Sequence, residues 1–600
     1  MNPISTAQPS GPAGSHERSG SSVAARWLLL LSSLCIPISA MAAAPRSNTD
    51  ESTASRARLS SEFRSSRFDQ GSSKMVRVII QYKQPVAASQ EAPGERDMKN
   101  QGALLHTRFS SIRATVMTVP SWMIPQIAKN PNVAYVTPDR AVQLSSSDED
   151  PISATTRDVA ATQFSVDGTG VGVAVIDSGV SDHPDLHTAS GASRVVYSES
   201  FVAGDISTGD KYGHGTHVAG IIGGNGSASA SGYAMKHPGM AAGANIINLR
   251  VLDQNGMGTD SQTIAAIQRA IALKSTYNIR VINLSLGRGV WESYSLDPLC
   301  QAVESAWKAG IVVVVAAGNS GRDNSMGTYG YATIGAPGND PYVLTVGASR
   351  TMGTATRVDD AIASYSSKGP SLGDHIVKPD LVAPGNRIDS LRVAGSTLDA
   401  NYPGYRVGPS AGGTAQYFRL SGTSMSTPVV TGAVALMLQK SSTLTPDQVK
   451  ARLMKTAWKS FTQYTSSMDV RNNSYNNQFD IFSYGAGYLD VTAALNNTDL
   501  ASGVALSPTA SRNLLTGAVT LTNTSLGLLS GQSVVWGNSV VWGNSVVWGN
   551  SVLGANSVVW GNSVVWGNTL LSGCSVVWGN SVVWGNSVTG ALSSDEDGEN

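Results

Sequence analysis

The chain has 600 residues, with 42 basic and 42 acidic side chains. This even balance gives no support to nucleic acid or an anionic membrane as the main partner. Charged residues make up only 14% of the chain and glycine occurs 62 times, which favours an extracellular protein with a sizeable core and many turns. The three cysteines, Cys35, Cys300 and Cys574, are too few for a disulfide framework.

Residues 1–44 have the pattern of a signal peptide behind a long leader. Arg26 precedes an apolar stretch that ends in small residues near Ala42 to Ala44, where a signal peptidase can cut. A membrane anchor is the alternative, but the apolar run is shorter than the ~20 residues of a spanning helix. We therefore expect a secreted or cell-surface protein, with a Ser- and Arg-rich linker over 45–73.

Residues 74–144 are predicted to form a small α+β domain. The segments MVRVIIQYK, ATVMTVP and VAYVTPD are predicted strands, and residues 97–109 and the segment SWMIPQIAKN are predicted helices. Strands and helices in this order fit a sheet with helices on one face. The domain ends at the acidic boundary SSSDEDP, after which a second domain is expected over 145–498.

Strands and helices alternate through residues 145–498, which predicts an α/β fold with a doubly covered parallel sheet. The predicted strands include VGVAVIDSGV, IINLRVL, VINLSLG, IVVVVAAGN and VLTVGA, and helical spacing appears in SQTIAAIQRAIAL and LCQAVESAWKAG. Asp177 falls where the first of these strands should end, and sites in open α/β sheets form at such ends. His214 stands between two glycines at a predicted helix start, where its ring is accessible.

Ser424 lies where a tight turn enters a predicted helix, within SGTSMSTPVVTGAV. Gly422 supplies the turn, and Pro428 suits a first helical turn. The unpaired N–H groups at a helix start stabilise a negative charge that forms beside Ser424. Taken alone, the same pattern is that of an ordinary serine cap, so the interpretation depends on a base and an acid elsewhere in the chain.

Four motifs supply that acid and base: VAVIDSGV, HGTHVAG, AAGNSG and GTSMSTP. Their chain order of Asp177, His214 and Ser424 is the subtilisin order of acid, base and nucleophile. Over about residues 150–498 the chain resembles the subtilisin-like serine proteases. The resemblance implies that Ser424 attacks the scissile carbonyl, that His214 moves its proton and that Asp177 orients His214. It also implies an oxyanion hole made by Asn319 and the N–H of Ser424.

The resemblance further implies a cleft in which an extended peptide lies between two edge segments. These segments are Ser285, Leu286, Gly287 and Gly256, Met257, Gly258. The segment ATIGAP is similar to the pocket floor of the family, where Gly335 leaves space. We therefore expect a large apolar side chain before the cut, in protein or peptide substrates.

Residues 74–144 resemble the inhibitor propeptide of the family, which assists the slow formation of a parallel sheet and blocks the site until it is cut. The chain's own propeptide is thus an expected partner, with a cut after Leu144. Leu592 also precedes an acidic segment, so self-cleavage at both places is a hypothesis.

The chemistry implied by the resemblance requires no cofactor. A structural calcium ion is compatible with it: Asp185 resembles a calcium ligand of the family, but its other ligands are not identifiable here. A zinc hydrolase is the alternative, because four histidines lie close together in sequence: His183, His187, His214 and His217. The HExxH arrangement is absent, which counts against zinc.

From Ser533 the hexad SVVWGN recurs, and it predicts a β-solenoid over 533–592, between a linker at 499–532 and an acidic tail at 593–600. A meander of short strands is the competing structure. The tryptophans are expected to form the solenoid core or to contact glycans or a cell surface. Two functions follow: a secreted, self-processing serine endopeptidase, or an adhesive repeat protein whose protease domain is incidental or inactive.

Overall fold

The computed structural model describes residues 54–65, 68, 72–86, 90–143, 164–354, 357–459, 464–469, 473–512 and 519–522. The expected signal peptide and the hexad repeats at 533–592 lie outside these residues. Within the described ranges, no helix is both long enough and apolar enough to cross a bilayer.

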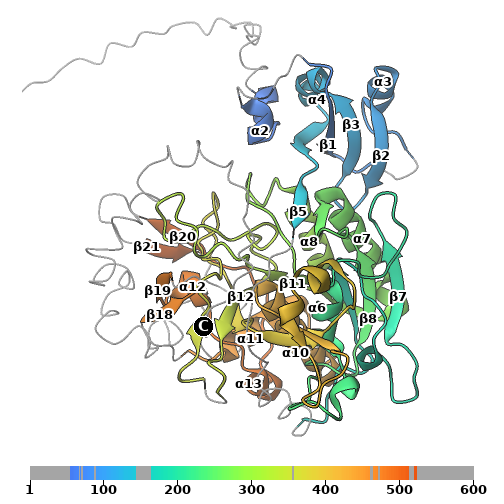
Figure 1. Ribbon diagram of the computed structural model, residues 1–600. Helices are drawn as coiled ribbons and strands as arrows, with labels where there is room; N and C mark the ends of the chain where they lie inside the picture. Colours follow the sequence, from blue (N-terminus) through green and yellow to red (C-terminus); the bar gives the residue numbers. More distant parts are fainter. Residues whose placement is uncertain are drawn as a thin grey trace, which may run out of the picture. The chain divides into compact units, whose positions relative to one another are not determined.

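The first part of the described chain is a four-stranded antiparallel sheet with short helices (Figure 1), in the strand order β2-β3-β1-β4. The two faces of β1 are both buried. Val78 and Ile80 pack with Ile127 of the accompanying helix, whereas Ile79 joins the core of the following region. The elements are α2 Ser61–Arg64, β1 Met75–Tyr82, α3 Glu95–Asn100, β2 Leu104–Phe109, β3 Ala114–Pro120, η1 Ser121–Met123, α4 Ile124–Lys129, β4 Val133–Pro138 and β5 Ala141–Gln143.

The prediction of one helix over 97–109 was wrong. The helix α3 ends at Asn100, and Gly102 then adopts a positive φ of 94°, which a continuing helix does not allow. The following residues form β2, which pairs antiparallel with β3. The other strands and the second helix of this region lie where the sequence predicted them.

The part of the chain from residue 164 onward is called the larger region. Its central sheet has eight strands, in the order β13-β12-β11-β10-β6-β8-β7, with β14 beside β12. It is mostly parallel, but β13 runs antiparallel to β12, so the expected all-parallel sheet is corrected to a mixed one. Apolar runs such as VVVVA in β11 are buried along their whole length. The strands are β6 Gly172–Asp177, β7 Val195–Ser200, β8 Asn245–Arg250, β10 Ile279–Leu284, β11 Val312–Ala316, β12 Leu344–Arg350, β13 Ala361–Ile362 and β14 Leu381–Pro384.

Two pairs of helices cover this sheet (Figure 1). The helix α7 packs on α8, and α6 packs on α10, which contacts five strands of the sheet: β6, β10, β11, β12 and β14. Thr259 and Gln262 form a capping box that starts α7, and Asp297 caps α8. These helices are α6 His214–Gly223, α7 Asp260–Tyr277, α8 Pro298–Lys308 and α10 Thr423–Lys440.

Smaller elements surround this sheet. The strands β15 and β16 flank β17 in a three-stranded sheet, whereas β18 pairs with β19 and β20 with β21. The strands are β9 Met257–Thr259, β15 Ile388–Leu391, β16 Arg406–Val407, β17 Tyr417–Leu420, β18 Tyr464–Met468, β19 Ser474–Gln478, β20 Thr509–Arg512 and β21 Val519–Thr522. The helices are η2 Pro184–Leu186, η3 Ser227–Ser229, α9 Thr397–Asn401, η4 Pro403–Tyr405, α11 Pro446–Thr456, α12 Ile481–Tyr484 and α13 Val491–Asn496.

Candidate active site

Asp177 and His214 meet where a strand ends and a helix begins. Asp177 is the last residue of β6, and His214 is the first residue of α6. The Nδ1 of His214 lies 2.9 Å from the Oδ1 of Asp177, and both side chains are fully buried. When Nδ1–H donates to the carboxylate, Nε2 of the neutral ring is an acceptor. Among the described residues, Nε2 has no hydrogen-bond partner.

The start of α6 is held against β6 at a short distance. A Cβ at Gly215 would lie 2.2 Å from the carbonyl oxygen of Gly179 and 3.1 Å from the carboxylate of Asp177. Only glycine therefore allows the backbone to approach this closely. This contact explains why the first glycine of the HGTHVAG motif, Gly215, is needed.

Asp210 fixes the same helix start, and the sequence reasoning did not identify it. Its carboxylate accepts the N–H groups of Gly213 and Thr216, at 2.7 and 2.8 Å. The hydroxyl of Ser178 bridges it to Asp177, at 2.8 and 3.2 Å. Asp210 is buried, and burial raises the pKa of its carboxyl group. An acidic residue just ahead of a helix start was the available signal, since carboxylates favour that position.

Ser424 is the second residue of α10, in the first turn where helix N–H groups lack intrahelical acceptors. Its Oγ donates to the carbonyl oxygen of Ser285 at 3.1 Å, and the Oγ of Ser285 donates to the carbonyl oxygen of Ser424 at 2.9 Å. Within the described residues, no hydrogen bond joins Ser424 to His214, although α10 and α6 pack against each other.

Pro428 does not lie in the first turn of the helix, where the sequence predicted it. The helix begins at Thr423, so Pro428 lies in its interior and not in its first turn. Proline has no N–H, and the carbonyl four residues earlier, that of Ser424, therefore lacks its helical partner. The hydroxyl of Ser285 supplies the missing donor, which fastens α10 to the segment after β10.

Asn319 follows β11 and faces the start of α10. Its Oδ1 accepts both the N–H and the Oγ1–H of Thr423, each at 2.9 Å. These two bonds fix the orientation of the carboxamide. Its Nδ2 is buried and has no partner within the described residues. A donor without an acceptor thus stands beside the first turn that carries Ser424.

The edge segments expected to hold a peptide lie on both sides of β5. Gln143 and Gly287 exchange two backbone hydrogen bonds, of 3.0 and 3.2 Å, and β5 pairs antiparallel with β9. The second edge is Met257–Thr259, one residue later than expected. Gly256 lies in the turn before it, with a φ of 71° and its N–H bonded to Asp253.

The two remaining residues that were predicted for the cleft are Leu286 and Gly335. Leu286 is buried. A Cβ at Gly335 would lie 3.1 Å from the carbonyl oxygen of Arg288, and its N–H donates to Ala317 at 3.0 Å. The absence of a side chain at Gly335 thus lets the segments after β10 and β11 approach each other.

Asp185 does not fit a calcium site. Its Oδ1 accepts the N–H of Ala228 at 2.7 Å and the hydroxyl of Ser227 at 3.1 Å, and its Oδ2 accepts the hydroxyl of Tyr417 at 2.7 Å. Calcium requires six to eight oxygen ligands, and here hydrogen-bond donors occupy the carboxylate. In the described part of the chain, no three His, Cys, Asp or Glu side chains are grouped to hold a metal ion.

The four histidines of the zinc alternative have separate partners. His183 contacts the carbonyl of Gln416, His187 contacts Asp182, and His214 contacts Asp177. The ring of His217 faces the carbonyls of Ile388 and Phe418, and burial lowers its pKa to about 3, which keeps the ring neutral. The imidazoles therefore do not converge on one point.

The chain is similar in sequence to known proteins. The family model described as the subtilase family matches residues 168–488. Serine protease AprX of Bacillus subtilis (strain 168) is 36% identical over 389 residues, which are 63% of this chain and 82% of that protein. Subtilisin E of the same organism is 34% identical over 425 residues, 70% of this chain and 91% of that protein.

A solved structure is also similar: fervidolysin from Fervidobacterium pennivorans, a keratinolytic enzyme related to subtilisin. The TM-score is 0.51 at 22% identity, over 73% of this chain and 62% of that one. At this identity the similarity supports the fold alone.

Proposed function

Because the chain belongs to the subtilase family of serine proteases, we propose that it is a secreted endopeptidase that cleaves peptide bonds through an acyl-enzyme on Ser424. The observation that carries the proposal is the 2.9 Å contact between Asp177 and His214, which leaves Nε2 as an unoccupied acceptor. A base with its ring oriented by an acid is what a serine hydroxyl needs to become a nucleophile.

Acylation begins when the hydroxyl of Ser424 leaves the carbonyl of Ser285 and turns toward His214. Catalytic hydrogen bonds often form only with substrate present. As Oγ of Ser424 bonds to the carbonyl carbon of the substrate, the hydroxyl proton passes to Nε2 of His214. The C–N bond then breaks, and the same proton goes to the leaving amine. A water molecule then attacks the acyl-enzyme with the same proton transfers through His214, and the carboxylic acid product is released. Asp177 stabilises the imidazolium in both steps.

The tetrahedral intermediate carries an oxyanion that needs donors. We assign these to Nδ2 of Asn319 and the N–H of Ser424. The first is buried and has no hydrogen-bond partner in the part of the chain that the structure describes, and its carboxamide is already oriented by Thr423. The second belongs to the first turn of α10, whose dipole favours negative charge. Donors fixed before the reaction cost no reorganisation during it.

Substrates are proposed to bind as an added strand between Met257–Thr259 and Gly287, as β5 does. That occupation also supports residues 74–144 as an inhibitor propeptide whose end blocks the cleft, with 145–498 as the enzyme. Cuts after Leu144 and Leu592, and a large apolar side chain before the scissile bond, stay predictions of this function. The signal-like sequence over 1–44 supports secretion.

Casein hydrolysis by the purified protein tests the proposal. Ser424→Ala should abolish hydrolysis, whereas Ser426→Ala is the matched control, because that hydroxyl of the same helix donates to the carbonyl of Ala383. Loss of activity in the first variant alone supports the enzyme. Equal activity in all three proteins would refute the role of Ser424. No activity in any of them would favour the adhesive alternative.

A further inference from the structure

The segment just before β5 is bound along its backbone by the larger region. The carbonyl of Arg140 accepts the N–H of Asp260 at 2.7 Å, the three residues of β5 pair with β9, and Gln143 pairs with Gly287. Four consecutive residues thus follow the path proposed for a substrate. Any residue at the position of Arg140 has its side chain directed by the same backbone contacts.

The side chain of Arg140 ends on Glu292, which belongs to the loop between β10 and α8. Its Nη1 and Nη2 donate to the two carboxylate oxygens, each at 2.6 Å. Nε and Nη2 also donate to Glu62 of α2, at 3.1 and 2.6 Å. The side chains of Arg140 and Glu292 are only 6% and 4% exposed. This is a buried bidentate pair, the geometry in which arginine recognises a carboxylate most strongly.

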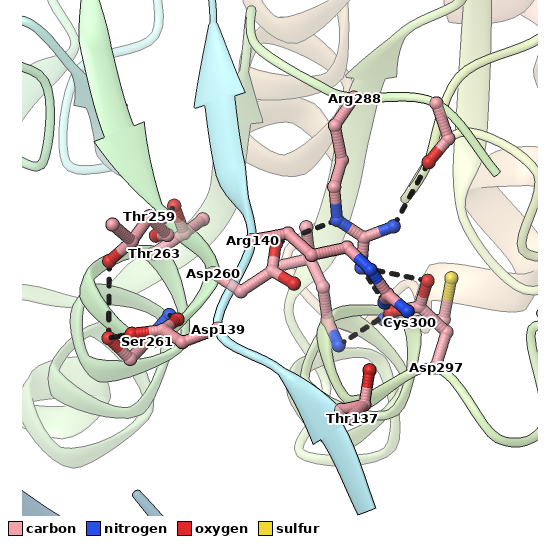
Figure 2. Close-up of polar contacts among 12 residues, drawn as sticks. Thr137, Asp139, Arg140, Thr259, Asp260, Ser261, Thr263, Arg288, Asp297 and Cys300 are labelled. Atoms are coloured by element: carbon pink, nitrogen blue, oxygen red, sulfur yellow. Dashed lines mark hydrogen bonds and ion pairs between the residues drawn. The ribbon is translucent and has the colours of Figure 1, made fainter. Parts of the chain in front are cut away.

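Among the described residues, the only cationic side chain that donates a hydrogen bond to Glu292 is that of Arg140, and Arg288 acts on it through its charge alone. The guanidinium of Arg288 is already shared by Asp260 at 2.8 Å and Asp297 at 2.8 and 2.9 Å (Figure 2). Without Arg140, the carboxylates of Asp260, Asp297 and Glu292 would share the single guanidinium of Arg288. The Oδ2 of Asp260, which is fully buried, has no hydrogen-bond partner in the described residues.

Burial is the main cause of the raised pKa values of the carboxyl groups of Asp260 and Glu292. Burial raises the pKa of Asp260 to about 7, although Arg288 and Arg140 oppose this shift. Burial also raises the pKa of Glu292, and the charge of Asp297 adds to the effect. Figure 2 shows Arg140, which immediately precedes β5, beside Asp260, Arg288 and Asp297. A cationic side chain placed here is therefore stabilised by more carboxylate charge than Arg288 alone compensates.

We propose that Glu292 and Asp260 form a distal specificity subsite for arginine in peptide substrates, three residues N-terminal to the residue that pairs with Gly287. In the precursor Arg140 fills this subsite. The inference rests on the proposed endopeptidase function. A substrate arginine lacks the contact with Glu62, but it keeps both oxygens of Glu292 and the N–H of Asp260. Lysine offers one point charge instead of a fork, so it binds less well.

The test uses internally quenched peptides that copy residues 137–150, with Arg140→Ala, Arg140→Lys and Arg→citrulline versions of the same peptide. The self-processed enzyme from the full chain should cleave the arginine peptide with a kcat/KM roughly 10- to 100-fold above the alanine peptide, as expected for a buried bidentate bond to a charged group. Citrulline has the same shape without the charge and should resemble alanine.

Variants of the enzyme then test whether Glu292 causes the preference for the arginine peptide. Glu292→Gln should reduce the ratio of the arginine to the alanine peptide to near one. Glu199→Gln is the matched control, because this carboxylate of the same region pairs with Arg269 away from β5, and it should keep the ratio. If the Glu292 variant is not secreted, the wild-type peptide series still decides.

Each remaining outcome has one meaning. Equal kcat/KM values for the arginine, citrulline and alanine peptides would overturn the subsite while leaving the endopeptidase intact. A preference for arginine that persists in Glu292→Gln would place the recognition elsewhere and overturn the assignment. Absence of cleavage of every peptide, with no labelling by a serine-directed fluorophosphonate, would instead refute the proposed function on which the inference rests.

Discussion

Replacing Asn319 separates the two functions that its carboxamide has in the structure. Oδ1 accepts two hydrogen bonds from Thr423, which orient the group, and Nδ2 has no partner among the described residues. Asn319→Leu removes both the acceptor Oδ1 and the donor Nδ2. The variant Asn319→Asp keeps Oδ1 and replaces only the donor.

The expected magnitudes follow from these contacts. Loss of one oxyanion donor in a subtilisin costs about 100- to 1000-fold in kcat, or about 2.7–4 kcal/mol, and we expect this loss in both variants of Asn319. Two accepted hydrogen bonds are worth about 0.5–1.5 kcal/mol each. Asn319→Leu should therefore lower the free energy of unfolding by about 1–3 kcal/mol. Asn319→Asp should lower it less, because a carboxylate is favoured at the start of α10.

The assay measures kcat and KM on one peptide, with the enzyme concentration fixed by active-site titration, and the free energy of unfolding from urea titration. Both variants should show a low kcat with little change in KM, since the donor acts on the transition state. If either folded variant kept a kcat near that of the wild type, Nδ2 of Asn319 would not be an oxyanion donor.

Three further predictions concern the surroundings of the site. Gly215→Ala should lower the free energy of unfolding by about 1–3 kcal/mol or prevent secretion, because the added Cβ would meet a backbone carbonyl at 2.2 Å; a wild-type urea midpoint would contradict this. Tyr417→Phe should lower the free energy of unfolding by about 1–3 kcal/mol, because it leaves Oδ2 of the buried Asp185 without its donor; a wild-type urea midpoint would contradict this. In the precursor, burial raises the pKa of Glu292, so protonation at acid pH should weaken its pair with Arg140. In the processed enzyme, protonation of the same carboxylate should make the preference for the arginine peptide decline toward acid pH; a ratio independent of pH would contradict this.

Strand ends and helix starts were predictable from local patterns. The run VGVAVID is apolar and β-branched, so β6 and the position of Asp177 at its end followed from the sequence. The glycines beside His214 likewise indicated where α6 begins. By contrast, the strand β2 was predicted as a helix, because the pairing with β3 that stabilises it is a tertiary contact.

The contacts that orient the site depend on residues far apart in the sequence. The bond between the hydroxyl of Ser285 and the carbonyl of Ser424 spans 139 residues, and the bond from Asn319 to Thr423 spans 104. Nothing local to either partner indicates them. Arg140 and Glu292 are 152 residues apart in the sequence, and their pairing becomes evident only when the structure places β5 beside β9.

The most direct test of the central claim is the site at which a fluorophosphonate attaches, mapped by mass spectrometry of the secreted protein. The reagent forms a covalent bond with an activated serine hydroxyl, and its attachment depends on the base beside that serine. The adduct is predicted on Ser424, with no labelling in His214→Ala. Attachment to another serine, or hydrolysis that persists in Ser424→Ala, would contradict the account.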